Sequence, residues 1–146
     1  MSVDGLTERR AVMTRLKTLA GGRVFKGVPD DETHKRFEDG TIKLYFVVLF
    51  SVPEPLAAGR SLTGGDTETP HTFIVTVTAY ADDADTAEQG AVAVRSLLRD
   101  WSPNTATATP FSGLGGYITN NSDARKKPTR FSEGSHFTCE INLGAD

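Results

Sequence analysis

The segment KLYFVVLF, residues 43–50, constrains the fold more than any other stretch of this chain. After the lysine, the only polar group among its seven residues is the Tyr45 hydroxyl. Alternate side chains of a strand point to opposite faces of its sheet. One face would carry Leu44, Phe46, Val48 and Phe50, and the other Tyr45, Val47 and Leu49. Both faces are therefore expected to leave water, and each needs a cover.

Length and composition indicate one ordinary globular domain spanning residues 1–146. Of the 146 residues, 38% are hydrophobic and 24% are charged, which is typical of a soluble chain with a real core. No apolar run approaches the roughly 20 residues that cross a bilayer, so no membrane association is expected. The formal net charge of −3 argues against a dedicated nucleic-acid binder, although it permits a protein that merely lines a path for DNA.

Two helices are predicted from apolar residues at helical spacing. The first follows Thr7 as its N-cap, continues to Ala20, and ends at Gly21-Gly22, where a left-handed residue can stop a helix. The second opens at Asp85, with Glu88 completing a variant capping box. Its predicted buried stripe is Ala87, Ala91, Val94, Leu98 and Trp101. The small residues early in this stripe should let the helix lie close to a sheet.

The remaining apolar segments are predicted to be strands. They cover residues 23–26, 44–52 and 71–80, a possible edge strand at 103–110, and a final strand in which Phe137, Cys139, Ile141 and Leu143 face the core. The order α-β-β-β-α-β-β predicts an α+β domain with a mixed, mainly antiparallel sheet and both helices on one face. Long loops are expected at residues 30–43 and 54–70. The other face of the sheet would then lack a cover from its own chain.

No catalytic, cofactor or metal site is expected. The three histidines, His34, His71 and His136, are scattered, whereas zinc needs three or four converging ligands. Cys139 is expected to be a small buried hydrophobe. The acids Asp82, Asp83, Asp85 and Glu88 fit a helix start, and residues 113–116 are read as a turn. The chain is therefore predicted not to be an enzyme, and a small ligand-binding or catalytic domain is the minor alternative.

One basic cluster stands out, formed by Arg125, Lys126, Lys127 and Arg130. Clusters of one sign are usually solvated, but this one can also meet an acidic neighbour or a phosphate backbone.

Several short motifs follow one another in order along nearly the whole chain. They are the first helix, GGRVF at residues 21–25, GVP at 27–29, the strand FVVL at 46–49, the second-helix residues Ala91, Arg95, Leu98, Asp100 and Trp101, and PTRF at 128–131 leading into FTC at 137–139. This series of motifs resembles the tail terminator and tail completion proteins of long-tailed bacteriophages. GRVFKGVP is the most specific of the motifs. The two long loops exceed the family minimum.

The resemblance implies a structural virion protein at the head-proximal end of the tail, assembled in the host bacterial cytoplasm. Such a subunit would form a ring, typically hexameric, that caps the tail tube, ends its polymerisation and presents the head-attachment surface. Its partners would be its own copies, the tail tube protein and a head-tail connector or stopper protein, with double-stranded DNA passing transiently through the lumen. A head-completion or connector subunit is the nearest alternative.

A cyclic ring needs two different patches on each subunit, which meet head to tail. The uncovered sheet face is a natural candidate for one patch, through Tyr45, Val47, Leu49 and Ile74; the alternative is that the loop 54–70 folds back over it. This loop is a candidate arm that reaches the tube or connector. The candidate tube or connector contacts are Arg60, Ser61, Leu62 and Asp66 in the loop, together with Arg125, Lys126, Lys127 and Arg130.

Overall fold

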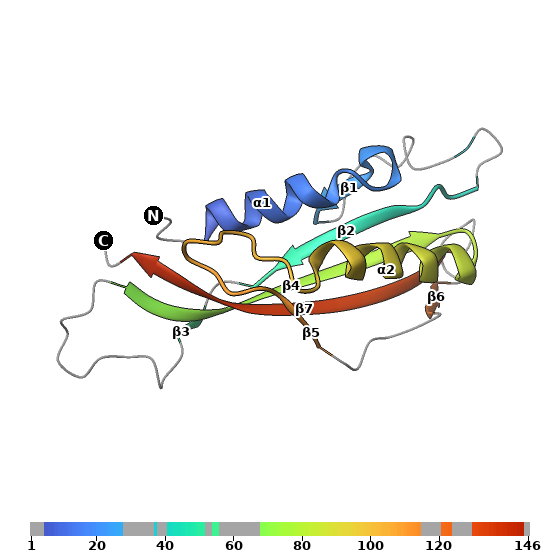
Figure 1. The fold of residues 1–146 in the computed structure, drawn as a ribbon. Coiled ribbons are helices and arrows are strands. Elements are labelled where there is room, and N and C mark those ends of the chain that lie inside the picture. The colour runs from blue at the N-terminus through green and yellow to red at the C-terminus, as the bar shows by residue number, and fades with distance from the viewer. Residues whose placement is uncertain are drawn as a thin grey trace.

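The computed structural model describes residues 5–27, 37, 41–51, 54–55, 68–114, 121–123 and 130–144. Two α-helices and seven strands make up this part of the chain (Figure 1). The helices are α1 (Leu6–Leu16) and α2 (Ala84–Leu98), and a short 3-10 turn, η1 (Ala20–Gly22), follows α1. The strands are β1 (Val24–Lys26), β2 (Tyr45–Phe50), β3 (Glu54–Pro55), β4 (Glu68–Ala81), β5 (Ser112–Leu114), β6 (Asn121–Asp123) and β7 (Arg130–Gly144).

The two long strands β4 and β7 lie side by side at the centre of a single mixed sheet. They pair antiparallel along their whole length, from Glu68 opposite Gly144 to Ala81 opposite Phe131. The main strand order is β1-β2-β4-β7-β5, with β3 pairing to β4 and β6 pairing to β7. Among the strands that the structure describes, only β1 and β2 pair in parallel. The predicted α+β class with a mainly antiparallel sheet is confirmed.

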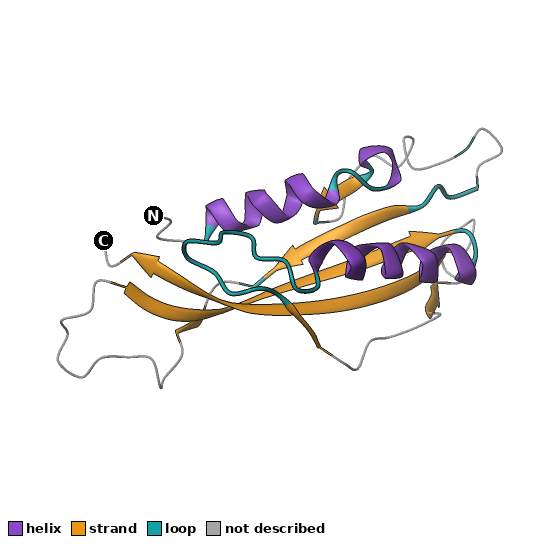
Figure 2. Cartoon of the chain, viewed as in Figure 1, coloured by secondary structure: helices purple, strands orange, loops and turns teal. Residues whose placement is uncertain are grey.

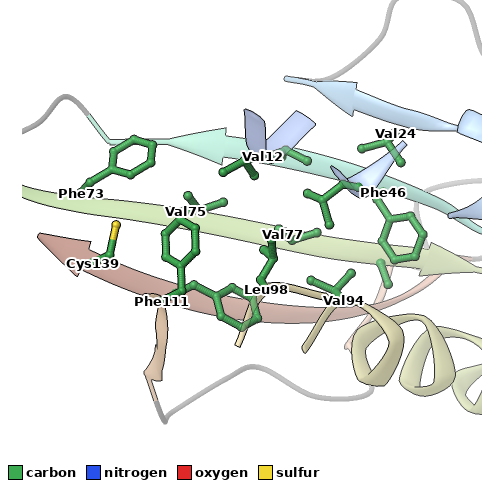
Figure 3. Close-up of a cluster of buried hydrophobic side chains, with 14 of the residues drawn as sticks. Val12, Val24, Phe46, Phe73, Val75, Val77, Val94, Leu98, Phe111 and Cys139 are labelled. Atoms are coloured by element: carbon green, nitrogen blue, oxygen red, sulfur yellow. The ribbon is translucent and has the colours of Figure 1, made fainter. Parts of the chain in front are cut away.

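Both helices cover the same face of this sheet, which we call the inner face (Figure 2). The main core lies between the two layers, and its side chains point toward one another there (Figure 3). It joins Val12 and Leu16 of α1 and Val94 and Leu98 of α2 to the inner face. The inner-face residues of this core are Val24, Phe46, Val48, Phe73, Val75, Val77, Ala79, Phe137, Cys139 and Ile141. Full burial stabilises each larger side chain by about 1.5–3 kcal/mol.

Helix α2 approaches the sheet closely because a glycine faces it. A Cβ added at Gly90 would lie 2.9 Å from Leu44 Cδ1 and 3.2 Å from Ala79 Cβ. Ala87, Ala91, Val94 and Leu98 are buried as predicted, whereas Trp101 lies past the end of the helix and is half-buried. The predicted cap at Asp85 is wrong: Asp83 is the N-cap, and its carboxylate accepts a hydrogen bond of 2.7 Å from the Thr86 backbone N–H.

Helix α1 begins earlier than predicted. Its N-cap is Gly5, with a φ of 76°, in place of Thr7, and the regular helix ends at Leu16. Gly21 and Gly22 do adopt positive φ, as the predicted stop requires. In its first turn, Glu8 is fully buried and its Oε1 accepts a hydrogen bond of 3.0 Å from Thr107 Oγ1. The positive end of the helix dipole favours a carboxylate at this position.

Two predictions about connecting segments need correction. The possible edge strand at 103–110 is reduced to residues 107–109, which pair antiparallel with β7 through the bridge of Ala108 to Ile141. The residues before them form a turn, because the Asn104 carbonyl and side chain accept hydrogen bonds from residues 106–108. A strand also forms at Ser112–Leu114, where residues 113–114 were expected to turn. The loop predicted at 54–70 is also shorter than expected, because its first residues form β3 and its last residues form the start of β4. Most of the two predicted long loops lies outside the described residues.

Candidate subunit interface

The outer face of the sheet, opposite the helices, holds the residues that were predicted to contact a neighbouring subunit. Strand register arranges its side chains in rows across β2, β4 and β7. The first two rows are Tyr45, Tyr80 and Ser132, then Val47, Thr78 and Gly134. The next row is Leu49, Thr76 and His136, and Ile74 and Thr138 follow it. The four predicted interface residues therefore do lie on one face, but in two different surroundings.

The end of the outer face that holds Tyr45 and Val47 is covered by the chain itself. Tyr45 is 3% exposed and Val47 is 6% exposed. Both pack with Ile42, which lies just before β2 and is itself buried. The Tyr45 ring stacks on Tyr80 at 5.1 Å between ring centroids, and Phe25 meets it edge-on. The prediction that this part of the face lacks an intrachain cover is wrong, since Ile42, in a stretch expected to be a solvated loop, supplies it.

Arg130 completes this cover. It is 6% exposed, and its Nη1 donates a hydrogen bond of 2.7 Å to the Tyr45 hydroxyl. Its guanidinium carbon lies 5.9 Å from the centroid of the Tyr45 ring, within the range of a cation–π contact. This burial argues against a surface contact with the tail tube for Arg130. Its partners in the predicted basic cluster, Arg125, Lys126 and Lys127, lie outside the described residues.

The other end of the face is open, and we call it the outer band: Leu49, Ile74, Thr76, His136 and Thr138. Leu49 is 55% exposed, and the other four side chains are half-buried. His136 lies on the outer side of β7, as predicted, and its Nδ1 is 2.9 Å from Thr76 Oγ1. Leu49 and Ile74 leave apolar surface in this band that another protein can cover. Assignment of the outer band to a subunit contact stays a prediction.

The candidate contacts of the predicted arm, Arg60, Ser61, Leu62 and Asp66, lie outside the described residues.

The described residues offer no evident reaction centre. Within them, no three metal-ligating side chains converge, and no helix is long and apolar enough to cross a membrane. Cys139 faces the core, and burial, with a smaller contribution from the Glu8 and Glu140 charges, raises the pKa of its thiol to about 12. A thiol with such a pKa is a poor nucleophile at neutral pH. The predicted core role of Cys139 is thus supported by its surroundings.

Comparisons with known proteins find likeness at the level of the fold. No protein-family model and no curated protein matches the chain. Among solved structures, a chain from the virion of a native gene transfer agent particle is similar. It is 20% identical with a TM-score of 0.51, over 94% of both chains. A second solved structure is 15% identical with a TM-score of 0.50, over 96% of both chains. These structures share the two-layer α+β architecture of this chain.

Proposed function

We propose that this chain is a structural virion protein of a tailed phage or phage-like particle, and that it acts as a tail terminator. In this role, copies of the chain form a homo-hexameric ring that caps the tail tube, ends its polymerisation and provides the surface for head attachment. Double-stranded DNA passes through the ring without specific binding. Neither a cofactor nor catalysis is part of the proposal.

The observation that carries the proposal is the match in fold to a virion chain of a gene transfer agent, which extends over 94% of both chains. The order of short motifs that resembles tail terminators adds support from the sequence. The finer assignment, to the end of the tail and to a ring, depends on that resemblance.

The outer band supports an assembled state. A half-exposed leucine and isoleucine on a sheet face are more stable when another surface covers them, because each covered apolar Å² contributes about 25 cal/mol before association costs. The covered end, Tyr45 and Val47, belongs to the folding core of the subunit. Of the four predicted residues, we therefore propose only Leu49 and Ile74 as contacts with another protein of the assembled particle, either a neighbouring copy of the chain or the tail tube.

Electron microscopy of particles tests the proposal directly. Deletion of the gene should give overlong tails, or heads without tails, and the wild-type chain supplied from a plasmid should restore normal particles. The purified chain, alone or with tail tubes, should form six-membered rings in negative stain. A stable two-fold dimer with and without tubes, or normal tails after deletion, would contradict the proposal. Normal tails that fail to join heads would indicate a connector subunit instead.

A further inference from the structure

A groove lies where α1 meets the ends of β1 and β2, on the side of the molecule away from the outer band. Its volume is about 480 Å³. The described apolar residues of its lining are Leu6, Met13 and Phe50, and Thr14 of α1 also lines it. A groove of this size with an apolar floor can take a few side chains of another protein.

The other described residues that line the groove are all basic: Arg9, Arg10, Lys17 and Lys26. Arg10, Lys17 and Lys26 are exposed, and the Lys26 ammonium lies 6.0 Å from the centroid of the Phe50 ring. Among the described residues that line the groove, none is acidic. In a chain whose net charge is −3, this concentration of positive charge over an apolar floor favours a partner that is both acidic and partly apolar.

The chain carries such a surface on α2. Asp85, Glu88 and Val92 follow one another at helical spacing on the side opposite the buried stripe, and all three are exposed. We call them the acidic stripe. Val92 is 56% exposed, which makes it one of three large hydrophobic side chains that are exposed in the described part of the chain. The acidic stripe and the groove are thus opposite in charge, and each contains apolar surface.

We infer that the groove beside α1 receives the acidic stripe of α2 from a second copy of this chain. Val92 of one copy would lie on the apolar floor of the next, and Asp85 and Glu88 would meet Arg10 and Lys17. The inference rests on the proposed ring, because it names the two patches that a head-to-tail contact needs. The two surfaces do not overlap: α1 covers the β1 side of the inner face, and α2 covers β4 and β7 (Figure 1). One copy can therefore use both at once.

A phosphate backbone is the competing occupant of a basic groove. DNA would satisfy the cations but would leave the apolar floor without a partner and would not use Val92. The second copy satisfies both features, so the observations favour it. The two occupants also differ in a test, because only protein contact brings α1 of one chain next to α2 of another.

Crosslinking through introduced cysteines tests the contact. Thr14 lines the groove and Val92 is on the acidic stripe, and both are exposed. Neither Thr14→Cys nor Val92→Cys alone should give dimers with a short bis-maleimide, because like surfaces do not meet. Their mixture should give covalent dimers, and the double variant should give a ladder that ends at the ring size. The native Cys139 is buried and should not react.

The matched control pairs Thr14→Cys with Thr105→Cys, because Thr105 is exposed in a turn that lies outside α2. Crosslinking of this control equal to that of the Thr14 and Val92 pair would overturn the inference. Charge reversal gives a second test. Arg10→Glu with Lys17→Glu should weaken self-association by roughly tenfold or more, as should Asp85→Lys with Glu88→Lys. Combining all four substitutions should restore much of the self-association that each pair of substitutions weakens. Unchanged association, or no restoration, would also overturn it.

The outcomes separate this inference from the proposed function. Rings that form without the Thr14 to Val92 crosslink would refute the contact and leave the terminator role intact. The crosslink in a chain whose deletion leaves tails normal would support the contact and refute that role. A short DNA duplex that binds the wild-type chain but not the Arg10→Glu, Lys17→Glu variant, without crosslinking between copies, would assign the groove to nucleic acid and overturn the inference.

Discussion

Two aspartate substitutions, two residues apart on the outer face of β2, should have opposite consequences. Val47→Asp puts a carboxylate at a position that is 6% exposed, whereas Leu49→Asp puts one at a position that is 55% exposed. Both changes place a poor strand former in the same strand, so the propensity cost of up to about 1 kcal/mol is common to them. The difference in stability between the two variants therefore measures how deeply each position is buried.

The magnitude follows from the surroundings of each site. Val47→Asp loses about 2 kcal/mol of apolar burial and places an uncompensated charge beside Ile42 and Tyr45, which costs about 3 kcal/mol more. A total near 5 kcal/mol is comparable with the whole stability of many domains. Leu49 keeps less than half of its surface buried, so its replacement should cost about 1 kcal/mol beyond the shared propensity cost.

Urea denaturation followed by circular dichroism measures both effects. We expect Val47→Asp to be unfolded or nearly so without denaturant, and Leu49→Asp to unfold cooperatively with a modestly lower midpoint. The loss caused by Leu49→Asp should instead appear in the assembly of particles. Equal destabilisation by the two substitutions, or a wild-type midpoint for Val47→Asp, would refute the division of the outer face into a covered end and an open band.

Three further predictions concern the inner side of the fold. Thr107→Val should lower the free energy of unfolding by about 2 kcal/mol in urea titrations, because it leaves the buried Glu8 carboxylate without its donor; Thr107→Ser should cost much less. Asp83→Ala should lower the melting temperature at pH 7. The backbone hydrogen bond from Thr86 lowers the pKa of Asp83 below its ordinary value of 3.8. The contribution of the ionised Asp83 to folding stability is therefore present above pH 3.8 and is lost as the pH falls through the lowered pKa of the folded state. The melting temperatures of the variant and the wild type should converge there. Cys139 should react with a disulfide reagent at pH 8 about 1,000-fold more slowly than an ordinary thiol, because its pKa of about 12 leaves little thiolate. Once urea unfolds the chain, it should react at the ordinary rate. Rapid reaction in the native state would contradict its placement in the core.

The elements that could be predicted from the sequence are those with a long local period. Strand β7 and the buried stripe of α2 repeat every 2 and about 3.6 residues, and such patterns report the face of an element without knowledge of the rest of the fold. The cap of α2 was misplaced because four acids stand near its start, and only the hydrogen bond to Thr86 distinguishes Asp83. The strand expected at 103–110 has alternating Thr and Ala, but Pro103-Asn104 is a turn signal that outweighs the alternation.

The candidate site was harder to predict because its cover is non-local. Arg130 reaches the Tyr45 hydroxyl across 85 positions of the sequence. Arg130 belongs to a cluster of like charges with Arg125, Lys126 and Lys127, and such a cluster is expected in solvent. Nothing in its spacing points to an aromatic partner. Ile42 gave a weak local signal, as an isolated apolar residue two positions before an apolar strand. Contacts between residues far apart in the sequence therefore determine which half of the outer face is open, and the periodicity of a single strand does not predict them.

The outer band and the groove can each contact a different partner in the assembled particle, and one experiment tests which partner each of them contacts. In a ring with one type of lateral contact, each subunit uses two patches. If the groove and the acidic stripe are those patches, the outer band is free for an axial partner such as the tube. The crosslink between Thr14→Cys and Val92→Cys should then persist when Leu49→Asp is added, while capping of tubes is lost. If the band is itself part of the lateral contact, Leu49→Asp should abolish the crosslink along with capping. The position of Leu49 on the face opposite to both helices favours the first result.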